Sequence, residues 1–296
     1  MNKKMLASAA AFLAAALYAI NIPFSKLLIE YVTPTMMAGL LYLGAGIGMF
    51  SYTSICGMFG KKVVKEPLTK KELPYTIAMI VLDIAAPILL MNGLRISSSA
   101  SATLLNNFEI VATSMIALVI FKEVVSKRLW MAIGLVTLSS IILTFEGEGS
   151  FTFNFGSLMV LGATICWGFE NNCTNKISNK SSEEIVIIKG VFSGLGSLIA
   201  AFIIGDQVPQ FIYILGVLIL GFVSYGLSIN FYISAQKYIG AAKTSAYYAI
   251  APFLGVIFSL ILLGERPGTQ FYVALGVMIL GTILIIRDTL SFSSDL

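Results

Sequence analysis

The chain is a succession of long apolar segments, separated by short breaks that are polar or contain Gly and Pro. A helix that crosses the hydrocarbon core of a bilayer needs roughly 20 mostly apolar residues. Ten segments have about this length, and we predict a transmembrane helix in each. The predicted spans are 6–29, 35–57, 74–93, 99–121, 128–146, 155–175, 183–204, 211–234, 242–263 and 269–287. Because the loops between them are short, neighbouring spans should be antiparallel.

Composition supports a lipid environment and excludes several functions. Of the 296 residues, 57% are hydrophobic and 11% are charged, whereas soluble domains carry about 25% charged residues. Ten spans and short loops use almost the whole chain, which leaves no room for a soluble domain. The absence of histidine excludes His-based catalytic triads, His-ligated metals and His proton relays. We therefore expect no cofactor, no metal and no nucleic-acid partner.

The distribution of lysine and arginine predicts the orientation of the chain. If the N-terminus is cytoplasmic, fifteen of these residues fall in cytoplasmic segments and three in outer ones, namely Lys26, Arg95 and Arg266. Lys189 lies within the seventh span and is not counted. Because short cytoplasmic loops are enriched in Lys and Arg, we expect both termini to be cytoplasmic, in a bacterial inner (plasma) membrane.

An internal repeat predicts the architecture. Residues 100–145 match residues 242–287 at a constant offset of 142, which aligns Glu123 with Glu265 and Gly134 with Gly276. The two halves, 1–146 and 147–296, would each hold five spans, so the second half enters the membrane from the opposite side. The predicted fold is an all-α membrane protein of ten transmembrane helices in two inverted five-helix repeats. Such a fold predicts alternating access to a site between the repeats.

Three segments carry a resemblance to a known family: Trp167-Gly168, the run 238–242 that leads to Ala251-Pro252, and the run 263–266. On these residues the chain resembles the drug/metabolite transporter superfamily, in its ten-span EamA-type branch, over nearly its full length. The resemblance implies a transporter of metabolites or drugs. The first repeat departs from the pattern because it has Glu109-Ile110 where the second has Ala251-Pro252, which leaves open whether the fourth span breaks as the ninth does.

Three acids fall within predicted spans, where an ionisable residue usually has a function. Glu109 shares a helix face with Asn106, and its alternative role is that of a hydrogen-bonded structural acid. Glu170 lies beside Asn171, and its alternative is a salt bridge to Lys189. Asp83 lies one turn before a proline, and could simply stabilise a kinked backbone there.

Aromatic and amide side chains complete the predicted site, although packing or an interfacial aromatic belt is the alternative for each of them. Tyrosine rings suit a cavity that binds an organic solute by stacking or by cation–π contact. The candidate solute- and proton-binding residues are Tyr18, Asn21, Asp83, Asn106, Glu109, Trp167, Glu170, Asn171, Tyr225, Asn230, Tyr247 and Tyr248. Gly44, Gly48, Gly190 and Gly194 have the spacing of close helix packing.

These patterns predict a secondary transporter of a small amine-bearing metabolite or drug, cationic or zwitterionic. We expect a central cavity lined by the first, third, fourth, sixth, eighth and ninth spans, with the fifth and tenth at the periphery. Proton coupling would use Glu109, assisted by Glu170, because burial favours the protonated acid and a bound cation favours the carboxylate. The partners would be solute, membrane lipids and protons, in a monomer or weak dimer. An uncoupled facilitator is the alternative, and a membrane-embedded sensor or enzyme is disfavoured.

Overall fold

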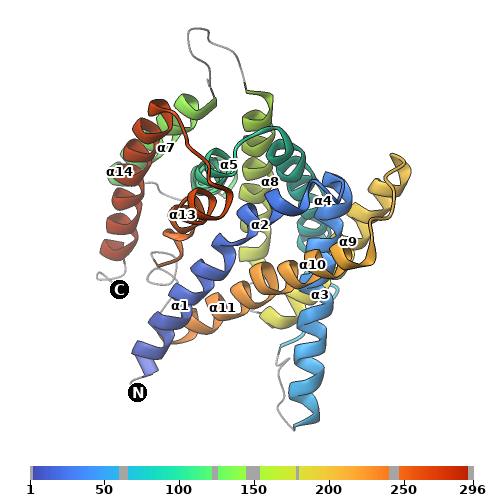
Figure 1. Ribbon diagram of the computed structural model, residues 1–296. Coiled ribbons are helices and arrows are strands. Elements are labelled where there is room, and N and C mark those ends of the chain that lie inside the picture. Colours follow the sequence, from blue (N-terminus) through green and yellow to red (C-terminus); the bar gives the residue numbers. More distant parts are fainter. Residues whose placement is uncertain are drawn as a thin grey trace.

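The computed structural model describes residues 3–59, 66–121, 126–144, 154–177, 180–239 and 247–292, and its regular structure in these ranges is entirely helical (Figure 1). Eight helical stretches there are long and apolar enough to cross a membrane. They are Met5–Leu28, Pro34–Met58, Leu73–Ile96, Ser99–Ile120, Lys127–Thr144, Ser182–Ile203, Phe211–Tyr232 and Thr269–Arg287. The protein is therefore an all-helical, multi-pass membrane protein.

The expected sixth and ninth spans are not among these eight. The sixth corresponds to α8 (Phe155–Ile177), which has the necessary length but ends in the polar run from Glu170 to Lys176. The ninth is represented by the shorter apolar helix α13 (Ala251–Leu263). The start of that expected span, and the boundary expected between residues 146 and 147, lie outside the described residues.

The main helix packing joins the two halves of the chain. Helix α3 (Pro34–Met58) packs along α9 (Ser182–Ile203), α4 (Leu73–Ile96) along α8, and α1 (Lys3–Ala19) along α11 (Ser228–Ile239). The α3–α9 contact is close, because a Cβ atom on Gly190 would lie 2.4 Å from the backbone nitrogen of Gly46. Of the glycines singled out in the sequence, Gly190 and Gly194 lie at this contact, whereas Gly44 and Gly48 face Leu218 and Phe222 instead. The hydrophobic core is therefore largely the interface between the halves.

Helices α7 (Lys127–Thr144) and α14 (Thr269–Phe292) pack against each other at one edge of the molecule, on the left in Figure 1. The Ser139 hydroxyl donates a hydrogen bond to the carbonyl of Ala274 at 2.7 Å and helps to join them. These helices correspond to the fifth and tenth predicted spans, which we expected at the periphery.

Several spans are interrupted near their middle. The first consists of α1 and α2 (Asn21–Leu28), with Pro23 just after the break, where its ring cannot donate a helical hydrogen bond. The eighth consists of α10 (Phe211–Gly221), the π-helical turn η1 (Phe222–Leu227) and α11. Such π turns often occur at functional sites.

The fourth span is also broken, although the sequence left open whether this helix is interrupted. It consists of α5 (Ser99–Leu105) and α6 (Phe108–Phe121), separated by Asn106 and Asn107. The Asn106 amide donates to the Tyr18 hydroxyl at 3.0 Å, and the Asn107 amide donates to the Thr282 hydroxyl at 3.1 Å. The break is therefore stabilised by partners on two other helices.

Two charged residues join helix ends at one end of the bundle. The Lys26 ammonium on α2 donates to the carbonyls of Leu94 and Ser97, each at 2.6 Å, where α4 ends. The Glu265 carboxylate accepts the backbone N–H groups of Ser99 and Ala100, at 2.7 and 2.8 Å, where α5 begins. Each charge complements the partial charge of the helix end that it contacts, so α2, the α4–α5 turn and the end of α13 are held together.

Candidate functional site

A small pocket lies where the first, fourth and ninth spans meet. The ninth span is also interrupted, because a turn at residues 249–250 separates the helical residues 247–248 from α13. The cavity volume of the pocket is about 10 Å³, and it is lined by Tyr18, Ala19, Ile22, Thr103, Asn106, Ala251 and Pro252. Two buried oxygens of this lining, Thr103 Oγ1 and Asn106 Oδ1, have no hydrogen-bond partner among the described residues. Buried polar atoms are normally hydrogen-bonded, so these two acceptors indicate a place for a donor supplied by a ligand or water.

Tyrosine rings cluster beside the pocket. The Tyr18 ring centroid lies 6.1 Å from that of Tyr225 and 5.6 Å from that of Tyr248, and the Tyr42 and Tyr225 centroids are 5.2 Å apart. The Asn21 amide donates to the Tyr225 hydroxyl at 3.0 Å, which holds the first span to the π-helical turn. The cluster offers both π faces and hydroxyl groups to an organic cation.

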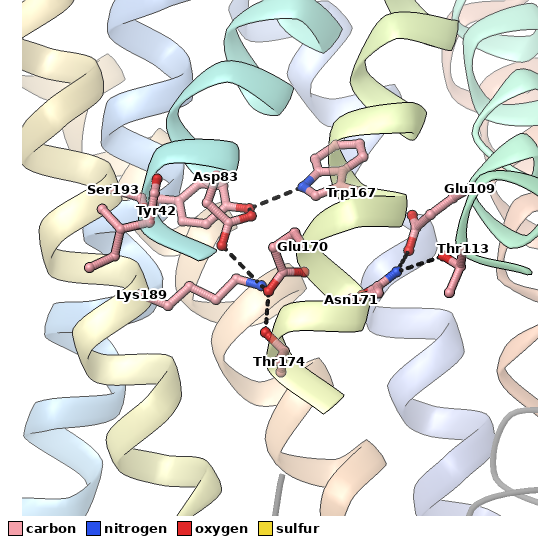
Figure 2. Close-up of polar contacts among 11 residues, drawn as sticks. Tyr42, Asp83, Glu109, Thr113, Trp167, Glu170, Asn171, Thr174, Lys189 and Ser193 are labelled. Atoms are coloured by element: carbon pink, nitrogen blue, oxygen red, sulfur yellow. Dashed lines mark hydrogen bonds and ion pairs between the residues drawn. The ribbon is translucent and has the colours of Figure 1, made fainter. Parts of the chain in front are cut away.

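Glu109 lies in the first turn of α6, one helical turn beyond Asn106. Figure 2 shows its carboxylate directed towards Asn171 of α8, whose amide donates to Glu109 Oε1 at 2.6 Å. The same amide lies 3.4 Å from the Thr113 hydroxyl. Glu109 is also close enough to Tyr18 to act on it electrostatically. The acid is therefore positioned between α8 and the tyrosine cluster.

A second charged group lies on the other side of α8 (Figure 2). The Lys189 ammonium of α9 lies 3.1 Å from Asp83 Oδ2 of α4 and 2.9 Å from Glu170 Oε1 of α8. The Thr174 hydroxyl donates a hydrogen bond to Glu170. The side chains of Asp83 and Glu170 are 0% and 2% exposed, and that of Lys189 is 14% exposed. We call Asp83, Glu170 and Lys189 the ion triad.

Tyr42 connects the ion triad to the tyrosine cluster. Its hydroxyl donates to Asp83 Oδ1 at 2.8 Å and accepts a hydrogen bond from the Trp167 indole N–H at 3.3 Å. Its ring contacts that of Tyr225 in the cluster. A continuous chain of polar side chains therefore runs from the ion triad to the edge of the pocket.

The structure brings many of the expected site residues together, but in two groups. Glu170, which we expected to assist Glu109, pairs with Lys189, as in its alternative interpretation, and Asn171 is the α8 residue that contacts Glu109. Asn230 lies near Tyr52 of α3. Tyr247 is 40% exposed, in contrast to Tyr42 and Tyr225, which are buried.

Sequence reasoning missed Tyr42 and Thr103 as site residues. Along the sequence of its span, Tyr42 is flanked on both sides by apolar residues and glycines. A lone hydroxyl group in such a run is the signal that could have identified it. Thr103 lies one turn before Asn106 on the same helix face, so the polar face of Asn106 and Glu109 could have been extended to it.

The part of the chain that the structure describes contains no group of three or more Cys, Asp and Glu residues that could hold a metal ion. The side chains gathered at the pocket and the ion triad carry hydroxyl, amide, carboxylate and ammonium groups, which can form polar contacts with a solute.

Comparison with known proteins places these features in context. The sequence profile of the EamA-like transporter family matches residues 5–145 and again residues 154–287. An uncharacterized transporter of Methanothermobacter thermautotrophicus is 23% identical over 90% of this chain and 82% of its own length. The uncharacterized inner membrane transporter YedA of Escherichia coli is 24% identical over 87% of this chain and 83% of its own length. A solved protein structure covering 94% of both chains superimposes with a TM-score of 0.67 at 15% identity, which shows a shared fold.

Proposed function

Because the chain belongs to the EamA-like transporter family, we propose that it is a secondary transporter of a small amine-bearing solute, a cationic or zwitterionic metabolite or drug. The single observation that carries the choice of solute is the pair of unpartnered acceptors in the pocket, Thr103 Oγ1 and Asn106 Oδ1. An ammonium group has three N–H donors and no acceptor. It therefore suits two buried oxygens and tyrosine faces better than an anion would.

Glu109 would supply the charge that the pocket itself lacks. It lies one helical turn beyond Asn106, and its present partner is the neutral amide of Asn171. An ammonium group could replace that amide as the donor and form an ion pair with the carboxylate, which the neutral amide cannot do. For a zwitterion, the N-terminus of α13, which begins at Ala251 in the pocket lining, would favour the carboxylate.

Transport would proceed by alternating access between two inverted halves. The family profile matches the chain twice, once in each half. The third span packs on the sixth, and the first packs on the eighth. If the first and sixth spans are equivalent, and the third and eighth likewise, these are the same contact made twice, as two related repeats require. The contacts of Lys26 and Glu265 close one end of the bundle in this state, and opening that end would require them to separate.

The proposed orientation has both termini in the cytoplasm of a bacterial cell. The excess of Lys and Arg in the corresponding loops supports it. The first residues of α1 and the last residues of α14 also lie in the lower half of Figure 1, towards the same side of the bundle. In this orientation Lys26 and Glu265 would lie on the outer side of the membrane.

The test is uptake into liposomes that contain the purified full-length protein. Radiolabelled amino acids, diamines and monoamines would be offered with and without an imposed pH gradient, and each would be compared with its N-acetylated, uncharged-nitrogen analogue. We expect at least one amine to enter faster than into protein-free liposomes, and to accumulate above equilibrium only with the gradient. Uptake of that amine without any response to the gradient would indicate an uncoupled facilitator. Entry of the acetylated analogues alone would contradict the proposed solute class.

A further inference from the structure

We propose that the ion triad of Asp83, Glu170 and Lys189 is a proton-binding site, separate from the solute site at Glu109. The triad joins three helices, α4, α8 and α9, deep in the bundle (Figure 2). Only its role in coupling depends on the proposed transport function. Proton binding by the triad is a property of the folded protein and does not depend on any solute.

The charge of the triad supports this inference. Two carboxylates and one ammonium leave one excess negative charge when all three groups are ionised, and one proton on either carboxylate removes it. Asp83 and Glu170 are 0% and 2% exposed, so water cannot screen the excess charge effectively. An uncompensated charge within a membrane protein is costly. The neutral form, with one proton shared by two carboxylates, is therefore favoured.

Among the described residues, Lys189 is the cation within ion-pair distance of both carboxylates. Other ionisable groups that act on the triad include Tyr42 of α3, Cys173 of α8, Tyr225 of the π-helical turn and, from further away, Glu109 of α6. All of these are neutral or negative. The Tyr42 hydroxyl already donates to Asp83, and the Thr174 hydroxyl donates to Glu170. Because the two carboxylates share one lysine, the proton belongs to the triad as a unit rather than to one residue.

Helix α8 gives the triad a direct connection to the solute site. Glu170 and Asn171 are consecutive residues on this helix, and they contact Lys189 and Glu109 respectively. Loss or gain of the proton changes the attraction between Glu170 and Lys189, which would shift α8 and move Asn171 relative to Glu109. The solute and the proton can therefore influence each other without sharing a carboxylate.

The experiment is infrared spectroscopy of the purified full-length protein during a pH titration, which detects the C=O stretch of a protonated carboxyl group. In the neutral pH range, exposed carboxyls are already ionised, so a band that titrates there reports a buried acid. We expect such a band in the wild-type protein. The part of it that the triad contributes should be lost in Asp83→Asn and in Glu170→Gln, because either change leaves one carboxylate balanced by Lys189, whereas any part that Glu109 contributes should remain. These two variants test the same point, so one folded variant is sufficient.

A third variant should increase the amount of protonated carboxyl group, whereas the first two decrease it. Lys189→Met leaves two carboxylates with no cation, so roughly twice as much protonated carboxyl should be observed. The matched control is Glu72→Gln, outside the membrane-spanning segments, where hydrogen bonds from Thr69 hold the pKa of Glu72 below its usual range. This control should leave the band unchanged.

The absence of a titrating band in the wild-type protein would overturn the inference. A band of undiminished intensity in both amide variants would also overturn it, and complete loss of the band in Glu109→Gln would assign the proton to Glu109. No solute is used, so these outcomes are independent of the uptake experiment. A protein that binds this proton and transports none of the tested amines would refute the proposed solute class and leave the triad assignment intact.

Discussion

Glu109 contacts Asn171 because α6 begins directly after the Asn106–Asn107 break and packs on α8. The sequence could identify Glu109 as a candidate, because an acid in an apolar span is conspicuous and Asn106 lies one turn away. It could not identify the partner. That partner depends on which face of α8 meets α6, and Glu170 and Asn171 differ by only one position on that helix.

At the residue scale, the account predicts that Glu109→Gln abolishes stabilisation by amines. A ligand present at about 100 times its Kd stabilises the folded state by about 2.7 kcal/mol, which corresponds to a rise in Tm of roughly 5 °C or more. We expect this rise for the wild-type protein with a transported amine, and none for the variant, whose neutral amide cannot pair with an ammonium group. Thermal unfolding in detergent measures it. Glu72→Gln is the control and should respond like the wild type. An equal rise in Glu109→Gln would show that Glu109 does not bind the amine.

At the element scale, the interrupted helices differ in how far the sequence could predict them. Pro23 and Pro252 mark the interruptions of the first and ninth spans, because proline disrupts helical hydrogen bonding. The break in the fourth span has no such marker. Asn106 and Asn107 are stabilised by Tyr18 and Thr282, so the break depends on tertiary contacts that a local pattern does not contain.

The close packing of α3 on α9 gives a prediction with a matched control. A methyl group added at Gly190 would lie 2.4 Å from the backbone nitrogen of Gly46, whereas one added at Gly134 of α7 would meet nothing within 4 Å. Gly190→Ala should destabilise the protein by about 1–3 kcal/mol through overpacking. Gly134→Ala should be neutral or stabilise it by about 0.5–1 kcal/mol, because alanine is the better helix former. Unfolding titrated with a denaturing detergent measures both. Equal effects of the two substitutions would show that the helices are not in this close contact.

At the scale of the whole molecule, the repeat offset of 142 residues predicts which positions of the two halves are equivalent, which the pattern within a single span cannot do. It aligns Asn106 and Asn107 with Tyr248 and Ala249, directly before α13 begins at Ala251. The corresponding interruptions therefore fall at equivalent positions of the two proposed repeats. The count of spans was less predictable, because α8 carries the polar residues of the site and is consequently less apolar than an ordinary membrane helix.

The account as a whole separates the solute, held at Glu109, from the proton, held by the ion triad. Changes at the Glu109 site should therefore affect solute transport and proton transport differently from changes at the ion triad. Glu109→Gln removes solute binding, and with it the proton movement that depends on solute. Asp83→Asn removes the excess charge of the triad but leaves the pocket intact.

The most direct test is to record both movements in the same liposomes, with a labelled amine for the solute and an enclosed pH-sensitive dye for the proton. For the wild-type protein, we expect addition of the amine to produce solute entry together with a pH change inside the liposomes. Glu109→Gln should show neither movement, and Asp83→Asn should show solute entry with no accompanying pH change. The account would be contradicted if Glu109→Gln moved solute and protons as the wild type does, or if the wild-type protein moved no amine at all.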